Sequence, residues 1–176
     1  MATDEPLVEP IEPRAGKSLR DIASASLAGA TATAFATLAF MFFIAYPDDR
    51  WSLDYLAYTV FALQLTMGAW ALAIHAPLWL LVERRGRGKY LAMLIEVLIM
   101  LPVVALTLLT MAALSAINFI SIAALAVIPV LVLAGTAGIA SRNDRMRRRG
   151  WLFWLGVTAA AFVIWFFSGV LPRLLG

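Results

Sequence analysis

Two ionisable side chains interrupt the longest apolar part of this sequence, and their spacing predicts that they meet. His75 is the only histidine of the chain, and Glu96 lies inside a long run of apolar residues. The basic segment 83–89 lies between them. If this segment joins two antiparallel membrane helices, residues whose numbers sum to about 171 lie at the same depth, as His75 and Glu96 do. An imidazole and a carboxyl group at one depth can share a hydrogen bond or exchange a proton.

Further polar residues extend this pattern along the same two helices. Gln64 and Thr107 also lie at matching depths, and Thr110 follows one turn later. Gln64 precedes the histidine by eleven residues, a spacing that a regular α-helix places on one face. The pattern therefore predicts a polar seam that serves as a candidate substrate or proton path, formed by His75, Glu96, Gln64, Thr107 and Thr110.

Three interpretations of the pair remain open at this point. The first is a structural hydrogen bond that fixes the register of the two helices. The second is proton or ion coupling along the seam. The third makes His75 an axial ligand of a tetrapyrrole, with Trp70, Trp79 and Met100 around it. The identity of any cofactor stays unknown, and one histidine excludes bis-histidine haem within a single chain.

Composition places the chain in a lipid bilayer and excludes several kinds of chemistry. The 176 residues are 62% hydrophobic and 14% charged, with a mean hydropathy of +0.87, whereas soluble domains are about 25% charged. The absence of cysteine excludes disulfides and thiolate metal sites. The residues form no serine–histidine–acid set, paired metal-binding histidines or phosphate-binding glycine loop. We therefore expect neither an enzyme nor a metal site.

The apolar segments predict an all-α, polytopic membrane protein, a bundle of five transmembrane helices. Residues 1–18 hold four acids and three prolines and are expected to form a flexible tail. Residues 97–141 carry no charge and are too long for one crossing, which takes about 20 residues, so the chain is expected to turn near 115–118. The expected helices are 19–46, 53–82, 90–114, 119–140 and 151–171.

Basic residues predict the orientation of this bundle. The net charge is +3, and arginines concentrate in segments 83–89 and 142–149. By the positive-inside rule both segments and the N-terminus are cytoplasmic, and the C-terminus lies outside. We interpret these charges as contacts with lipid headgroups and expect no nucleic-acid partner. The high arginine and alanine content favours a bacterial inner (cytoplasmic) membrane as the location.

Small residues predict close packing between helices. They form rows on two of the expected helices: Ser24, Ala28, Ala32 and Ala36 with Gly29 beside them, and Gly135 with Gly138. Such rows let helix backbones approach closely in lipid. The primary hypothesis is therefore a non-enzymatic accessory or packing subunit of a larger membrane assembly, bound to other subunits or to itself. The alternative is a small proton-coupled transporter or ligand-binding carrier that uses His75 and Glu96.

In outline, five spans, this length and six tryptophans resemble the tryptophan-rich sensory or translocator family. That resemblance implies a membrane fold that binds porphyrins or sterols. The clustered Trp-Pro signatures of the family do not occur in this sequence, so no residue role is carried over.

Overall fold

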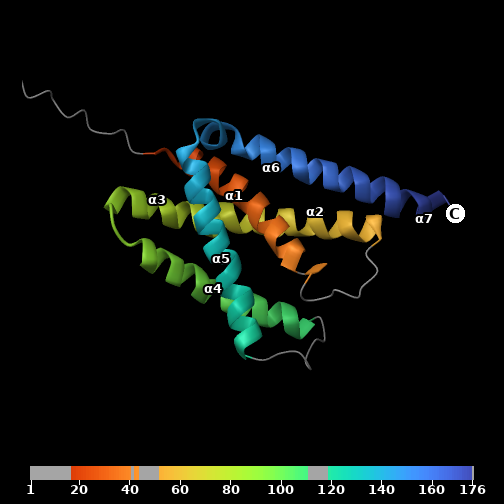
Figure 1. Ribbon diagram of the computed structural model, residues 1–176, viewed down its shortest axis with the longest axis horizontal. Helices are drawn as coiled ribbons and strands as arrows, with labels where there is room; N and C mark the ends of the chain where they lie inside the picture. Colours follow the sequence, from red (N-terminus) through yellow and green to blue (C-terminus); the bar gives the residue numbers. More distant parts are fainter. Residues whose placement is uncertain (1–16, 41, 44–51, 111–118, 176) are drawn as a thin grey trace, which may run out of the picture.

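The computed structural model describes residues 17–40, 42–43, 52–110 and 119–175, with the backbone alone for 103–110 and 119–126. This part of the chain is all-helical, without a β-strand (Figure 1). The helices are α1 (Leu19–Phe40), α2 (Leu53–Trp70), α3 (Ala76–Arg85), α4 (Lys89–Thr110), α5 (Phe119–Arg142), α6 (Asp144–Trp165) and α7 (Leu171–Leu175). Two π-helical turns join consecutive helices: the first π-turn (Ala71–His75) links α2 to α3, and the second (Phe166–Val170) links α6 to α7.

Three of the described helical segments are long and apolar enough to cross a membrane. They are Leu19–Phe40, Leu53–Arg85 and Asp144–Leu175, and Val127–Arg142 is a shorter apolar helix. These segments agree with the membrane class that the composition predicts. The count of five crossings stays a prediction. So do the turn at 115–118 and the flexible tail, of which only Lys17 and Ser18 lie within the described residues.

The second basic segment is helical, whereas the sequence predicted a loop over 142–149. Only Asn143 breaks the helix between α5 and α6. Its side-chain oxygen accepts hydrogen bonds from the backbone N–H groups of Arg145 at 3.0 Å and Met146 at 3.3 Å. This N-cap satisfies donors at the start of α6, so a single residue is enough to turn the chain.

Helix α1 lies at the centre of the bundle, in contact with α2, α5 and α6 (Figure 1). Every residue from 24 to 31 is buried. A Cβ atom at Gly29 would lie 2.8 Å from the backbone nitrogen of Ala137 in α5. A Cβ atom at Gly150 in α6 would meet the carbonyl oxygen of Ser24. Small residues therefore bring the backbones of three helices together, and the close approach predicted from Ser24, Ala28 and Gly29 occurs within the chain.

The predicted row of small residues on α1 is only partly used for this packing. Ser24 and Ala28 are buried, and the hydroxyl of Ser24 donates to the carbonyl of Met146 at 3.2 Å. Ala32 and Ala36 are exposed. The row thus packs against α6 at its first half and leaves the bundle at its second.

Gly135 and Gly138 pack against no other helix within the described part of the chain, so their predicted packing role stays a prediction for contacts with other subunits. Both residues are exposed, and no described atom lies within 4 Å of a Cβ built at either. The reason is the rotation of α5 about its axis, which turns Leu133, Ala134 and Ala137 toward α1 instead.

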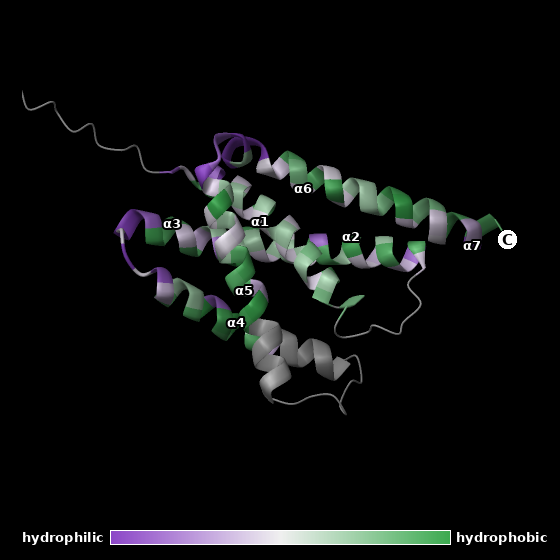
Figure 2. Ribbon diagram, in the orientation of Figure 1, coloured by the Kyte–Doolittle hydropathy of each residue, from purple (hydrophilic) through white to green (hydrophobic). Residues whose placement is uncertain are grey.

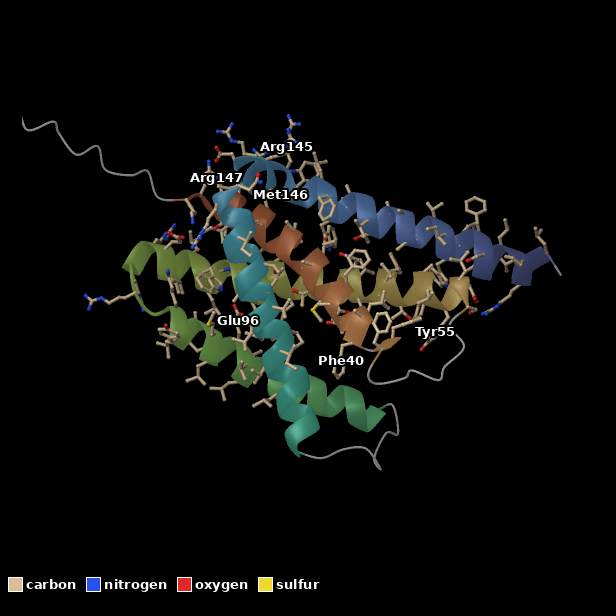
Figure 3. All side chains as sticks on the ribbon, viewed as in Figure 1. Phe40, Tyr55, Glu96, Arg145, Met146 and Arg147 are labelled. Carbon is tan, nitrogen blue, oxygen red and sulfur yellow. The ribbon has the colours of Figure 1, made fainter. Side chains whose placement is uncertain are left out.

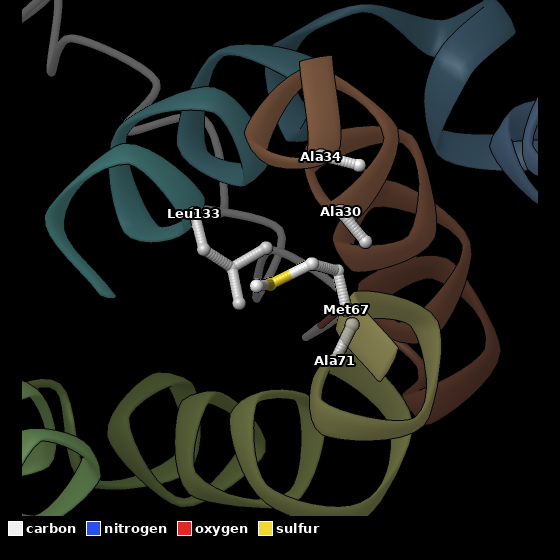
Figure 4. Close-up of a cluster of buried hydrophobic side chains, with 5 residues drawn as sticks. All are labelled: Ala30, Ala34, Met67, Ala71 and Leu133. Carbon is white, nitrogen blue, oxygen red and sulfur yellow. The ribbon is translucent and has the colours of Figure 1, made fainter. Parts of the chain in front are cut away.

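Met67 joins α2 to this packing. Its side chain lies between the small residues Ala30 and Ala34 of α1 and the side chain of Leu133 in α5, with Ala71 beside it (Figure 4). A long flexible thioether fills the space that alanines leave. This cluster holds the first π-turn firmly at the centre of the molecule.

Hydrophilic residues gather at one end of the bundle. Figure 2 shows them at the end of α3, the start of α4 and the start of α6. The segments 83–89 and 142–149, far apart in sequence, therefore share one end of the molecule.

Candidate functional site

His75 and Glu96 are in direct contact. Nδ1 of the imidazole lies 2.8 Å from Oε1 of the carboxyl group. Their side chains are 2% and 0% exposed, so the pair is buried. Glu96 lies on the side of α4 that faces α3 and α5 (Figure 3). The contact predicted from equal depth is confirmed.

The first π-turn sets the position of the histidine, which is its last residue. The N–H of Ala76 donates to the carbonyl of Ala71, five residues earlier instead of four. Pro77 follows in the first turn of α3 and has no N–H to donate. Its ring would also crowd the carbonyl of Ala73 in a regular helix, and the wider turn removes this clash. The second π-turn stands in the same relation to Pro172, which occurs in the first turn of α7.

Gln64 does not join this pair. It is fully buried, but its side-chain oxygen accepts from the hydroxyl of Thr31 at 3.3 Å, and its carbonyl accepts from the indole of Trp154 at 3.0 Å. It therefore faces α1 and α6, not α4. The cause is the π-turn, which changes the phase of the helix between Gln64 and the histidine. The side chains of Thr107 and Thr110 lie outside the described ones, so their place in the seam stays a prediction.

A cavity of about 190 Å³ lies beside the pair, between α1, α3, α4 and α5. Its wall includes His75 and Trp79, whose ring centroids are 5.4 Å apart. Glu96 already takes up Nδ1 of the imidazole, so Nε2 is the ring nitrogen left for the cavity. A neutral imidazole can accept a proton at one nitrogen and donate at the other. The geometry therefore connects the cavity to a buried carboxyl group.

Charged side chains from three parts of the chain complete the cavity wall at the hydrophilic end. They are Lys17, Glu83, Lys89 and Arg142. Nζ of Lys17 donates to Glu83 at 2.9 Å and to the hydroxyl of Ser141 at 3.4 Å. This contact ties the chain before α1 to the ends of α3 and α5. No signal in the sequence pairs Lys17 with Glu83, because 66 residues separate them and no period relates them.

The second carboxyl oxygen of Glu96 bears on how the pair exchanges a proton. Oε2 is buried and has no hydrogen-bond partner among the described residues. Nearly all buried polar atoms in folded proteins are paired. The carboxyl group thus keeps an oxygen that the protein does not occupy, at which a proton can be added or removed.

The arrangement does not fit a tetrapyrrole on His75. Trp70 and Met100 pack in a separate cluster with Val130 and are not part of the cavity wall. A cavity of about 190 Å³ is also smaller than the roughly 300–1,000 Å³ of sites for drug-sized molecules. The described residues contain no group of three His, Asp or Glu side chains that could hold a metal ion.

No protein-family model, no curated protein and no solved structure matches this chain.

Proposed function

We propose that this protein is a small proton-coupled membrane carrier in which His75 and Glu96 bind and release the proton. The observation that carries the proposal is the double placement of His75, which contacts Glu96 at 2.8 Å and also forms part of a cavity wall. Ionisable side chains at membrane depth are costly and face a partner or a water-filled cavity. His75 has both.

The proton would pass through the imidazole in two transfers. A proton from the cavity adds to Nε2, and the proton on Nδ1 moves to Oε1 of Glu96. The ring is then neutral again, with its proton on Nε2, and a change of tautomer resets it. Beyond Glu96 the path continues toward Thr107 and Thr110, the residues that the sequence predicts for it. Each transfer moves one proton and needs no other reactant.

The geometry supports a carrier better than the accessory or packing subunit. The small residues of α1 suggested a surface for partner subunits or self-association. Residues 24–31 are instead buried within the chain itself. The accessory hypothesis thereby loses part of the surface that suggested it, although Ala32, Ala36, Gly135 and Gly138 are exposed. The contact between His75 and Glu96, on which the carrier depends, is present.

The proposal places five crossings in a bacterial inner membrane, with the N-terminus cytoplasmic and the C-terminus outside. The shared hydrophilic end of Figure 2 supports this orientation, since both basic segments lie there. Reporter fusions after residues 87 and 146 should give a cytoplasmic signal, and fusions after 50, 117 and 176 an external one. A cytoplasmic signal at 176 would overturn the odd number of crossings.

The proton pair is tested by proton movement in reconstituted liposomes, in which a trapped pH-sensitive dye reports the proton current whether or not net charge moves. Applying a library of small solutes under a pH gradient should produce currents in the wild type for the transported solute. Glu96→Gln and His75→Gln should each reduce them to the level of empty liposomes, because an amide can keep the hydrogen bond but cannot relay a proton. Thr158→Val is the matched control, since its buried hydroxyl donates to Trp154 of its own helix and to no other described residue.

Melting curves complete this test. Both amide variants are expected to melt close to the wild type, so a lost current then reports chemistry and not unfolding. Wild-type currents in Glu96→Gln would rule out the pair as the proton carrier.

A further inference from the structure

Granting the proposed carrier, we infer that its substrate is a small oxyanion of the carboxylate or phosphate class, which binds in the cavity between Arg142, Lys89 and His75. The inference rests on the charges, shape and volume of the cavity wall, and it names the kind of molecule that moves with the proton.

The wall carries an excess of positive charge. Three cationic side chains and one carboxylate line it, which gives a net charge of +2 with a neutral histidine. Lys17 is paired with Glu83 at 2.9 Å. Lys89 and Arg142 form no ion pair within the described part of the chain. Two cations therefore remain to bind an anion in a cleft whose wall is mostly positive, which raises the local concentration of anions.

The shape of the wall agrees with such a ligand. The planar guanidinium of Arg142 matches carboxylate and phosphate oxygens in a bidentate fashion, and the ammonium of Lys89 adds a point charge. Trp79, Ala134 and Ala137 form an apolar part of the same wall. A volume of about 190 Å³ admits an anion of a few non-hydrogen atoms but not a large organic molecule.

Anion and proton would support each other's binding. A proton taken up by His75 adds positive charge to the wall and strengthens the attraction for an anion. By linkage, a bound anion then strengthens proton binding by the same factor. Of the charged groups around the imidazole, Glu96 and Glu83 oppose the anion, and Lys17, Lys89 and Arg142 favour it. This mutual strengthening of binding would couple the movement of the proton to the movement of the anion.

The only histidine of the chain provides a direct readout. Full-length protein labelled with ¹⁵N-histidine is placed in phosphatidylcholine nanodiscs and titrated with inorganic phosphate or acetate. The ring-nitrogen resonances of His75 should shift and saturate. Arg142→Gln should weaken the apparent affinity about tenfold or more. Glu83→Gln should strengthen it, because it removes a repulsive charge and releases Lys17. Arg145→Gln, at the same end but outside the wall, should leave it unchanged.

Two glycines of α5 provide a steric test. Gly138 lines the cavity and Gly135 does not, while no described atom lies within 4 Å of a Cβ built at either position. Both Gly138→Leu and Gly135→Leu should therefore fold. Only Gly138→Leu fills the cavity, so only this variant should lose the phosphate-dependent shift.

The lipid composition of the nanodisc distinguishes a free anion from a lipid headgroup as the ligand. Nanodiscs that contain phosphatidylglycerol and no phosphate should leave the resonances in place if the substrate is a free anion. A shift under these conditions that Arg142→Gln abolishes would assign the same site to a lipid headgroup.

The oxyanion site is overturned if neither anion source moves the resonances, or if Arg142→Gln and Gly138→Leu leave the shift unchanged. If the anion test fails but the currents are normal, the carrier stands and the oxyanion site is rejected. If the Glu96→Gln protein binds the anion saturably and its currents are undiminished, the oxyanion site stands and the proposed proton pair is rejected.

Discussion

Replacing His75 by leucine should lower the free energy of unfolding by about 3–5 kcal/mol, because it leaves a buried carboxyl group without its partner. Glu96 is 0% exposed, and Oε2 already lacks a partner in the described part of the chain. Glu96→Leu should have a comparable effect through the orphaned imidazole. Unfolding in mixed detergent–SDS micelles, followed by tryptophan fluorescence, measures both variants.

The double variant separates the pair from its surroundings. His75→Leu with Glu96→Leu removes both polar groups at once and replaces them with apolar side chains of similar volume. Its loss of stability should be much smaller than the sum of the two single losses. Additive losses would show that each side chain acts through other contacts. The double variant should carry no protons although it folds, which makes it a stringent negative control for transport.

Gly150→Ala should be the most damaging single-methyl change in the bundle. A Cβ there would meet the carbonyl oxygen of Ser24 and lie 3.0 Å from Cβ of Ala28. The first obstacle is backbone, which cannot rotate away as a side chain does, so α6 must separate from α1. We expect a loss of about 1–3 kcal/mol, as for other overpacked cores. Thermal melting of the purified protein measures it.

Gly156→Ala is the matched control on the same helix. No described atom lies within 4 Å of a Cβ at Gly156. Alanine is the better helix former by about 1 kcal/mol, so this variant should melt at or above the wild-type temperature. If both alanine variants melt equally low, the close contact between α6 and α1 does not explain the loss.

The first π-turn marks how far the polar seam could be predicted from the sequence. Counting outward from the basic segment 83–89, the helix is regular until His75, so the depth rule correctly pairs this residue with Glu96. Gln64 lies beyond the π-turn. The extra residue in that turn rotates α2 by about 100° relative to α3, and Gln64 consequently faces α1 and α6. Nothing in the periodicity of apolar residues reveals such a turn, although Pro77 is a local reason for it.

Contacts between distant segments could not be predicted from the sequence, for a different reason. The rows of small residues correctly indicate that helices approach closely, but the rotation of each helix depends on all its neighbours together. Gly29 therefore packs against Ala137, while Gly135 and Gly138 pack against no other described helix and Gly138 borders the cavity. The cavity likewise needs Lys17 and Arg142 at one place. From the sequence alone, the positive-inside rule explains both charges without any site.

The central position of α1 has a consequence for the order in which the protein matures. Among the three segments long enough to cross a membrane, α1 has the lowest hydropathy and the largest buried share. Its closest neighbours are α5 and α6, and the hydroxyl of Ser24 accepts a hydrogen bond from the backbone of Trp151, 127 residues later in the chain. The first of these helices to leave the ribosome thus completes its surroundings only when the last one has been made. Until α6 is synthesised, Ser24 has neither Met146 nor Trp151 as a partner, and a chain arrested before residue 150 leaves this side of α1 uncovered.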